Sequence, residues 1–263
     1  MAALFEISGF VSGRFVGFVL VALIFVLTYY YMGRKKAPYL RRVAALDAIE
    51  EAIGRSTEMG KPVVCSYGIG GFDYWTLAGL SILSYVADIC ARTDTRLIVP
   101  TGGGHESYMV REQAVDLVKT RYLIAGKPEM FNEDDMPFLS GEQYAYTPGY
   151  VGLLVRERPG AVIMTGSHYS EAMNITEMAN GVEAFTITAG CYTGNMAALA
   201  CASDYIMLGE EQPAAGAYLS KDPQQLASIR VQDIYKFIEI ALIILGLIAI
   251  NLGSDVINRL MIT

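Results

Sequence analysis

Histidine, cysteine and basic residues are scarce in this sequence, and each shortage argues against a class of site. The 263-residue chain has two histidines and four cysteines, and no two cysteines form a CxxC pair. We therefore expect reduced thiols in a cytoplasmic domain, with no disulfide framework and no metal site. Between Lys61 and Asp222 there are 10 basic against 19 acidic residues. A nucleic-acid surface needs clustered positive charge, so we expect no nucleic-acid partner.

Three signatures of nucleotide binding or catalysis are also absent. The sequence has no P-loop with its lysine, no GxGxxG followed by an acidic ribose partner, and no GxSxG elbow. These absences argue against a P-loop enzyme, a dinucleotide-binding domain and an α/β-hydrolase. The residues identify no cofactor.

Two long apolar runs lie near the ends of the chain. Residues 15–32 carry no charge over 18 positions, close to the roughly 20 that a helix needs to cross a bilayer. GRKK follows this run in place of a small-residue cleavage site, which favours an anchor over a signal peptide. Residues 234–252 form the second run, for which a buried core helix is the alternative. We expect two transmembrane helices in a lipid bilayer.

Basic residues between the two runs predict the orientation. Residues 33–42 contain five lysines or arginines, whereas Arg14 is the one basic side chain before the first run. By the positive-inside rule the middle of the chain is cytoplasmic, and residues 1–14 and 253–263 lie outside. Gly9, Gly13 and Gly17 recur every four residues, a spacing that lets helices approach closely in lipid. We expect a homo-oligomer formed through the transmembrane helices and the cytoplasmic domain.

Between the runs, the sequence alternates predicted strands and helices. A basic collar and an amphipathic helix are expected over residues 33–60, a domain over 61–222 and a linker over 223–233. Apolar strands are expected at about residues 62–67, 96–99, 161–164, 183–188 and 204–208. Their lack of polar alternation predicts an α/β, Rossmann-like domain: a mainly parallel five-stranded sheet with helices on both faces. The polar stretch 126–141 is expected to be a surface loop.

Glycine-rich loops follow most of the predicted strands. In an open parallel sheet, such loops gather at the carboxyl edge, where ligands bind. The candidate ligand-binding residues are Gly70, Gly71, Thr101, Gly102, Gly103, Gly104, Thr165, Gly166, Ser167 and Gly190. TGGGHES has the backbone of a phosphate-binding loop before a helix, but glycines at strand ends are more often turn residues.

The two histidines lie in loops of similar composition, PTGGGHES and TGSHYSE. If His105 and His168 share the loop edge, they can act as a general base, as ligand contacts or, with Glu106 and Glu171, as metal ligands, although two histidines alone are a weak metal signal. Cys191 follows a predicted strand at a helix amino terminus, where the pKa of a thiol can fall. These three residues are the catalytic candidates. The alternatives are histidines satisfied by loop backbone and a cysteine that packs in a tight turn.

Three segments resemble a known family. LDAIEEAIGRSTEMGKPV, TLAGLSIL and the late GEEQPAAGAYLSKDP are similar to a family of uncharacterised prokaryotic membrane proteins with a single domain of unknown function. The resemblance implies a prokaryotic cell membrane and assigns no catalytic residue. Two functions stay open. One is a self-associating scaffold or ligand-binding module of a membrane assembly, which fits the incomplete catalytic set. The other is an enzyme acting on a nucleotide or other small polar substrate.

Overall fold

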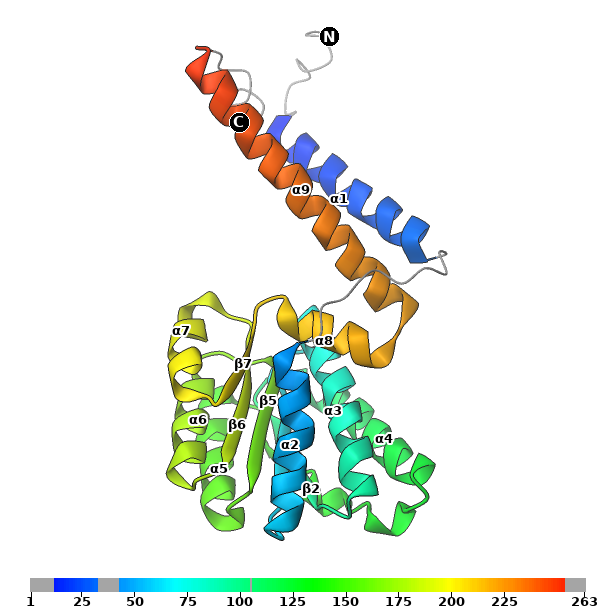
Figure 1. The fold of residues 1–263 in the computed structure, drawn as a ribbon, viewed down its shortest axis with the longest axis vertical. Coiled ribbons are helices and arrows are strands. Elements are labelled where there is room, and N and C mark those ends of the chain that lie inside the picture. The colour runs from blue at the N-terminus through cyan, green and yellow to red at the C-terminus, as the bar shows by residue number, and fades with distance from the viewer. Residues whose placement is uncertain (1–11, 33–42, 105, 254–263) are drawn as a thin grey trace. The chain divides into compact units, whose positions relative to one another are not determined.

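The computed structural model describes residues 12–32, 43–104 and 106–253 (Figure 1). The chain divides into two compact units, one of residues 40–220 and the other of residues 1–39 with 221–263. The first unit is an α/β domain. The described part of the second consists of two long helices.

The α/β domain is built on a wholly parallel sheet of five strands. They are β1 (Val63–Gly68), β2 (Leu97–Ile98), β5 (Ala161–Ser167), β6 (Phe185–Gly190) and β7 (Tyr205–Leu208). Their order in the sheet is β2-β1-β5-β6-β7, and every pairing is parallel. The five strands lie where the sequence predicts them, so the α/β class with a mainly parallel sheet is confirmed.

Helices cover both faces of this sheet, because successive strand residues point to opposite sides. Cys65 and Ile163 face one apolar core, and Val64 and Val162 face the other. The helices on the first side are α2 (Ala44–Glu58), α3 (Tyr74–Arg92), α4 (Ser107–Ile124) and α8 (Glu211–Ser220). Those on the second side are α5 (Gln143–Glu157), α6 (Glu171–Gly181) and α7 (Thr193–Ala202). Figure 1 shows the resulting three layers, which explain strands that are apolar on both faces.

A second, smaller sheet joins the chain after β2 to the chain before α5. β3 (Thr101–Gly102) pairs in parallel with β4 (Phe138–Ser140). The expected surface loop over residues 126–141 is therefore wrong for its last part, because the Thr101 N–H donates to the Pro137 carbonyl and Met136 is buried. The same segment has two single-turn 3-10 helices, η2 (Pro128–Met130) and η3 (Glu133–Asp135).

The second unit contains α1 (Ser12–Met32) and α9 (Pro223–Asn251). α9 begins where the Asp222 carboxylate accepts from the backbone N–H groups two and three residues further on, with Pro223 at the first helical position. The linker expected over 223–233 is therefore helical and continuous with the second apolar run. The Tyr235 hydroxyl donates to the Leu20 carbonyl at 2.6 Å and ties the two helices together.

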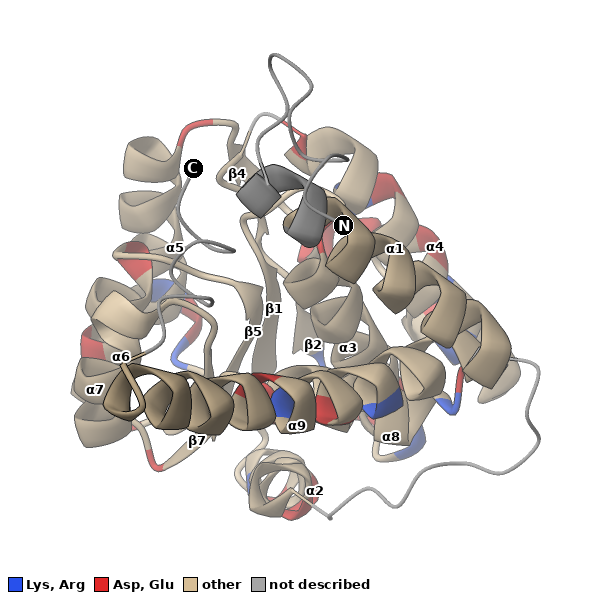
Figure 2. Cartoon of the chain, turned by 90° about the horizontal axis from the view of Figure 1, so that it is seen from above, with Lys and Arg blue, Asp and Glu red and all other residues tan. Residues whose placement is uncertain are grey.

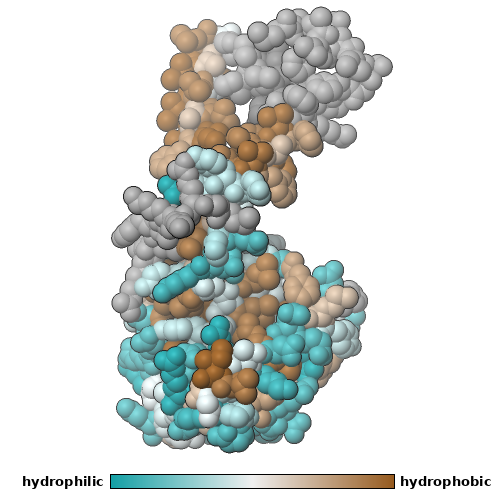
Figure 3. Space-filling view, turned by 90° about the vertical axis from the view of Figure 1, so that its right-hand side faces the viewer, coloured by the Kyte–Doolittle hydropathy of each residue, from teal (hydrophilic) through white to brown (hydrophobic). Residues whose placement is uncertain are grey.

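The surfaces of these two helices are apolar over much of their length. On α1, Phe18, Phe25 and Tyr29 are 70%, 72% and 78% exposed. On α9, residues 240–250 carry no charge, and Figure 2 shows the charged residues of α9 confined to its amino-terminal part. Figure 3 shows hydrophobic side chains, in brown, over the surface of this unit.

By length and composition alone, one helix of the described chain is long and apolar enough to cross a membrane, and it is α3. This helix is 61% buried within the domain, so its apolar residues form the core beneath the sheet. A shorter apolar helical stretch, Gly17–Tyr31, lies within α1. The apolar character of α3 thus reflects burial, whereas that of α1 is exposed.

Candidate functional site

The order of the strands reverses between β1 and β5. β1 has β2 on one side and β5 on the other, so the chain leaves β1 and β5 in opposite directions along the sheet. In open α/β sheets, ligands bind at this switch point, outside the carboxyl ends of the strands. The loops that follow the two strands here are residues 69–73 and 168–170.

Gly68 and Gly166 bring the two strand ends into close contact. Both have positive φ, 98° and 86°. A Cβ atom built on Gly68 would lie 2.8 Å from the Ser167 carbonyl oxygen, and one on Gly166 would overlap the Tyr67 carbonyl. Gly79 of α3 approaches just as closely, with its Cβ 2.9 Å from the Gly166 nitrogen. The floor of the site is therefore backbone packed on backbone.

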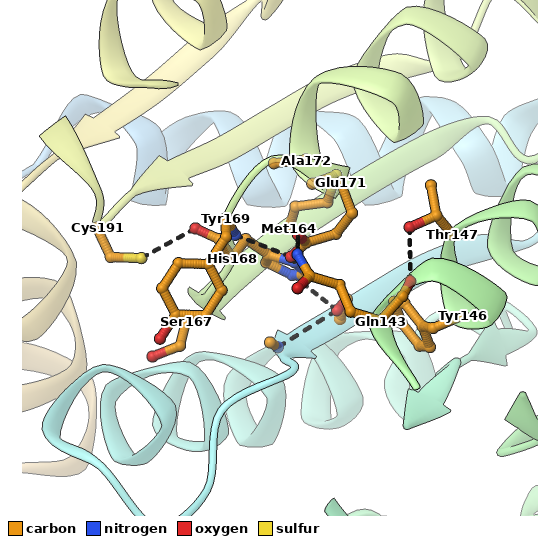
Figure 4. A network of polar contacts seen from close by, with 12 residues as sticks. Gln143, Tyr146, Thr147, Met164, Ser167, His168, Tyr169, Glu171, Ala172 and Cys191 are labelled. Atoms are coloured by element: carbon orange, nitrogen blue, oxygen red, sulfur yellow. Dashed lines mark hydrogen bonds and ion pairs between the residues drawn. The ribbon is translucent and has the colours of Figure 1, made fainter. Parts of the chain in front are cut away.

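A buried hydrogen-bond chain runs from β1 through the loop after β5 to α6. His168 Nε2 lies 2.9 Å from Ser66 Oγ, and His168 Nδ1 lies 3.2 Å from Glu171 Oε1. Because a carboxylate only accepts, Nδ1 donates to Glu171, which leaves Nε2 of the neutral ring to accept from the Ser66 hydroxyl. Figure 4 shows His168 pointing toward Glu171. This order has the hydrogen-bond polarity of a catalytic triad.

Glu171 holds the far end of this chain. Its Oε1 accepts from the Tyr169 N–H at 2.8 Å, and its Oε2 accepts from Gln143 Nε2 at 2.5 Å. Burial alone would raise the pKa of Glu171, but the His168 contact and the backbone N–H donors outweigh it and hold the pKa below its ordinary value. Glu171 also borders a surface groove of about 390 Å³ between α5 and α6, with Gln143 and Tyr144.

Complete burial of Ser66 distinguishes this chain from a hydrolase site. Ser66 is 0% exposed, and its Oγ accepts from the Gly68 N–H at 3.3 Å. A nucleophile must reach its substrate, and oxyanion donors must point at the reacting carbonyl oxygen. Neither condition is met at Ser66. In this arrangement the hydrogen-bond chain fixes the loop 168–170 to the sheet.

Asp73 joins the two loops at the switch point. Its Oδ1 caps α3 by accepting from the Thr76 N–H at 2.6 Å, and its Oδ2 accepts from Ser167 Oγ at 2.6 Å. A Cβ atom on Gly70 would lie 2.6 Å from Asp73 Oδ2. Thr165 lies deeper and donates to the Ser66 carbonyl at 2.9 Å. Of the predicted ligand-binding residues, Gly70 and Ser167 therefore meet directly beside Asp73.

Cys191 lies beside the loop after β5 without the environment of an activated nucleophile. Its Sγ donates to the His168 carbonyl at 3.2 Å, and Figure 4 shows it directed at this loop. Burial raises the pKa of the Cys191 thiol, and the Asp73 and Glu171 carboxylates add to this rise against the lowering by backbone hydrogen bonds. The thiol pKa thus lies above its ordinary value, whereas a nucleophile needs a lowered one. This supports a packing role.

One buried amide and two exposed rings complete this side of the site. Asn195 is 3% exposed; its Nδ2 donates to the Tyr169 carbonyl at 2.6 Å, and its Oδ1 has no hydrogen-bond partner. The rings of Tyr169 and Tyr192 have centroids 6.1 Å apart and planes 64° apart. They are 42% and 54% exposed. The two rings form an open corner beside the switch point.

The TGGGHES stretch is partly built into the small sheet. The N–H groups of Thr101 and Gly103 donate to the Pro137 and Ser140 carbonyls, so they are not free for a phosphate. Cβ atoms on Gly103 and Gly104 would overlap Ile69, which places this loop against the loop after β1.

Three further candidates frame the site. A Cβ atom on Gly71 would overlap the Glu106 carboxylate, one on Gly102 would overlap the Ser140 carbonyl, and the Gly190 carbonyl accepts from the Gly209 N–H. His105 lies outside the described residues, so its meeting with His168 stays a prediction. Among the residues that the structure describes, no group of three or more His, Cys, Asp or Glu side chains is placed to hold a metal ion.

Sequence reasoning missed Ser66, Asp73 and the tyrosine pair. Ser66 lies inside an apolar strand and gives no local signal. Asp73 could have been found, since aspartate directly before a helix is a common amino-terminal cap. Tyr169 and Tyr192 follow two neighbouring strands, and the site depends on their ring geometry.

The fold defines a doubly wound α/β domain with the flavodoxin-like strand order. Its switch point lies between β1 and β5, the first and third strands of the main sheet in chain order. The chain belongs to the family described as a domain of unknown function (DUF6754), whose model matches residues 4–261. The resemblance to a family with one domain of unknown function is thereby confirmed. No curated protein and no solved structure matches the chain.

Proposed function

We propose that this protein is a membrane-anchored ligand-binding module that holds a small polar molecule at the carboxyl ends of β1 and β5. The main observation behind this proposal is the reversal of strand order between these strands, since ligands of open α/β sheets bind at such a point. The loops after them are joined directly, because the Ile69 N–H donates to the Ser167 carbonyl at 2.8 Å and Ser167 Oγ donates to Asp73. Polar side chains from both loops therefore share one point of the sheet edge.

Two apolar helices support the anchoring. Exposed side chains such as Phe25 and Phe237, 72% and 73% exposed, belong to a continuous apolar surface on α1 and α9. Soluble monomers rarely expose apolar patches of more than a few hundred Å². The basic residues at 33–42 support a domain on the cytoplasmic side of the membrane with both termini outside, and the prokaryotic cell membrane is what the family resemblance implies.

Self-association through the membrane helices belongs to the same proposal. No described atom lies within 4 Å of a Cβ atom built on Gly17 of α1, so a second helix has room to approach there. Gly17→Leu should shift cross-linked dimers toward monomers in membranes, whereas Gly54→Ala in α2, where a Cβ also meets open space, should leave the cross-linking unchanged. Equal dimer yields in both variants and the wild type would argue against contact at Gly17.

An enzyme is the second candidate, because Ser66, His168 and Glu171 have the polarity of a triad. The buried Ser66 makes the ligand-binding proposal the stronger of the two. We expect a fluorophosphonate probe to leave Ser66 unlabelled in the folded full chain. Labelling that Ser66→Ala abolishes and Ser203→Ala preserves would favour the enzyme.

The single tryptophan of the chain provides a direct test of ligand binding. Trp75 lies in the first turn of α3, two residues after Asp73, and its carbonyl accepts from Gln212 Nε2 at 2.9 Å. The full chain in detergent is titrated with inorganic phosphate, ATP, glutamate and tetramethylammonium while Trp75 emission is recorded. We expect a saturable change with at least one compound, weakened by Ser167→Ala and unaffected by Ser203→Ala. No change in Trp75 emission with any of the four compounds would contradict the proposal.

Cys201 provides the test of membrane topology, since it is exposed. The protein should stay with membranes during alkaline carbonate extraction. A membrane-impermeant maleimide should label Cys201 after permeabilisation and leave it unlabelled in intact cells, with Cys201→Ser as the control. Labelling in intact cells would place the domain outside.

A further inference from the structure

We propose that the molecule bound at the switch point is a small organic cation, carrying a quaternary ammonium or protonated amine group. This rests on the proposed ligand-binding function and names the ligand class for the same site. The corner between Tyr169 and Tyr192 receives the cation. The two rings meet in a T-shaped arrangement with planes 64° apart and centroids 6.1 Å apart, and both remain partly exposed. Ring faces attract cations, with ammonium groups held between several rings as the best-known case.

The loops at this edge contain acidic residues and the two histidines, His105 and the buried His168, but no lysine or arginine. Residues 69–73, 99–106, 168–170, 191–192 and 209–210 contain Asp73, Glu106 and Glu210 but neither lysine nor arginine. Asp73 is joined through Ser167 to the loop that carries Tyr169. These loops thus offer carboxylates, and no lysine or arginine, to a cation at the tyrosine corner.

The pKa values of two groups at the corner are raised in part by nearby carboxylates. Burial raises the pKa of Tyr169, and Asp73, Cys191 and Glu171 raise it further. The pKa of Cys191 is raised by burial first and then by Asp73 and Glu171. Burial is the largest cause of both shifts, and backbone hydrogen bonds lower the pKa of Cys191. The smaller contribution of Asp73 and Glu171, common to both groups, shows that these carboxylates lie close enough to act on a charge at the corner.

Asn195, which is bonded to the backbone of Tyr169, has an unsatisfied acceptor. Its Nδ2 holds the Tyr169 carbonyl, whereas its Oδ1 is buried and has no partner. A buried acceptor without a hydrogen bond costs about 1–3 kcal/mol, so such groups usually have a partner in the working protein. An N–H or polarised C–H group of a cationic ligand is a partner of the right kind.

Anions are the usual ligands at this edge of α/β sheets, where they accept from backbone N–H groups. Here carboxylates and a carbonyl of the chain itself accept from such N–H groups. Asp73 accepts from the Thr76 N–H at the start of α3, and Glu171 accepts from the Tyr169 N–H at the start of α6. The Gly103 N–H is engaged by the Ser140 carbonyl. A phosphate would therefore meet carboxylates where it needs donors.

The test is a titration of the full chain in detergent with tetramethylammonium, followed by Trp75 emission, beside a parallel titration with inorganic phosphate. We expect saturable binding of tetramethylammonium and none of phosphate. Tyr169→Leu and Tyr192→Leu should each weaken binding by roughly three- to tenfold, whereas the phenylalanine variants should stay within about twofold of the wild type. Asp73→Asn should also weaken it, since asparagine keeps the cap of α3 and removes the charge.

Matched variants at the opposite end of the sheet serve as controls. Tyr205 at the start of β7 is 40% exposed, nearly as exposed as Tyr169, and Glu58 is an exposed carboxylate at the end of α2. Tyr205→Leu and Glu58→Gln should leave binding unchanged. Saturable binding of phosphate alone would overturn the cation and keep the ligand-binding function. Tetramethylammonium binding that ignores the tyrosine and Asp73 variants would overturn the assigned corner.

Discussion

The two edges of the parallel sheet differ in charge and in aromatic content. At the amino edge, the connections 59–62, 93–96, 158–160, 182–184 and 203–204 contain three basic and three acidic residues and no aromatic residue. At the carboxyl edge, the connections contain acidic residues and the two histidines but no lysine or arginine, together with Phe72, Tyr169 and Tyr192. The acidic groups also have different partners. Asp135 and Glu157 at the amino edge pair with Arg96, a kind of partner that the carboxyl-edge connections lack, whereas Asp204 at the amino edge and Asp73 at the carboxyl edge each accept from a backbone N–H and a hydroxyl.

The helix dipoles explain the distribution of charged residues between the two edges, but they do not explain the aromatic residues. The helices start at the carboxyl edge and end at the amino edge, so acidic residues near their first turns and arginines such as Arg92 and Arg156 in their last turns complement the helix dipoles. The dipoles give no reason for half-exposed aromatic side chains at the carboxyl edge. Aromatic side chains also occur at the amino edge, where Phe185 and Tyr205 begin strands, so the contrast holds for the connecting loops alone.

The largest expected effect tests the close packing of the carboxyl edge. Gly166→Ala should lower the free energy of unfolding by about 3 kcal/mol or more, because a Cβ atom would overlap the Tyr67 carbonyl at a positive φ. Gly60→Ala at the amino edge, with φ of 63° and open space around its Cβ, should cost about 1 kcal/mol. Unfolding of both variants in detergent measures the difference, and equal losses would remove this contrast between the edges.

A medium effect is expected at the carboxylates. Glu171→Gln should lower the free energy of unfolding by about 1–3 kcal/mol, because Glu171 is buried and accepts from His168, Gln143 and a backbone N–H. Since its folded-state pKa is depressed, the stabilisation is complete above about pH 4.3 and is lost as the pH falls through the lower folded value. The variant should lose this acid dependence.

Glu157 at the amino edge is the matched control for that variant. Burial would raise the pKa of Glu157, but its hydrogen bonds with Arg156 and Arg96 lower it. Because these arginines are exposed, Glu157→Gln should cost about 0.5 kcal/mol or less, and the cost should shrink as salt is added. A large, salt-independent loss of unfolding free energy in Glu157→Gln would show that the carboxylates at the two edges stabilise the domain to a similar extent.

The smallest expected effect concerns the thiols. Cys201 in the last turn of α7 is exposed and should react with iodoacetamide roughly tenfold faster than Cys191, whose thiol pKa is raised. Cys191→Ser should change the free energy of unfolding by about 0.5 kcal/mol or less. Mass spectrometry of partially alkylated protein gives both rates. Faster reaction at Cys191 than at Cys201 would support a role for Cys191 as a nucleophile.

The strands of the main sheet were predictable because each is an apolar run followed by turn residues, as in PVVCSYG and AVIMTGS. The small sheet was not, since β3 and β4 have two and three residues and lie in polar or glycine-rich sequence. The start of α9 was also misjudged. Pro223 has the appearance of a helix breaker, but after Asp222 it occupies the first helical position, where a missing N–H costs nothing.

The place of the site was predictable, but its chemistry was not. Parallel strands put their following loops at one edge, and Gly70, Gly166 and Ser167 lie there, whereas their role in ligand binding stays a prediction. No sequence pattern reveals that the amides of Thr101 and Gly103 are used by a second sheet. Nor does the sequence tell that His168 is enclosed between Ser66 and Glu171, because Ser66 is 102 residues away.

The strand order also has a consequence during synthesis of the chain. Val63 of β1 pairs with Ala161 of β5, so about a hundred residues must be made after β1 before its second neighbour exists. At roughly 5–20 residues per second, this takes on the order of 5–20 seconds. During that interval the apolar segment Val63–Gly68 has an unpaired edge of the kind that promotes aggregation. The reversal that defines the proposed ligand-binding point thus makes the nascent domain most vulnerable at its centre.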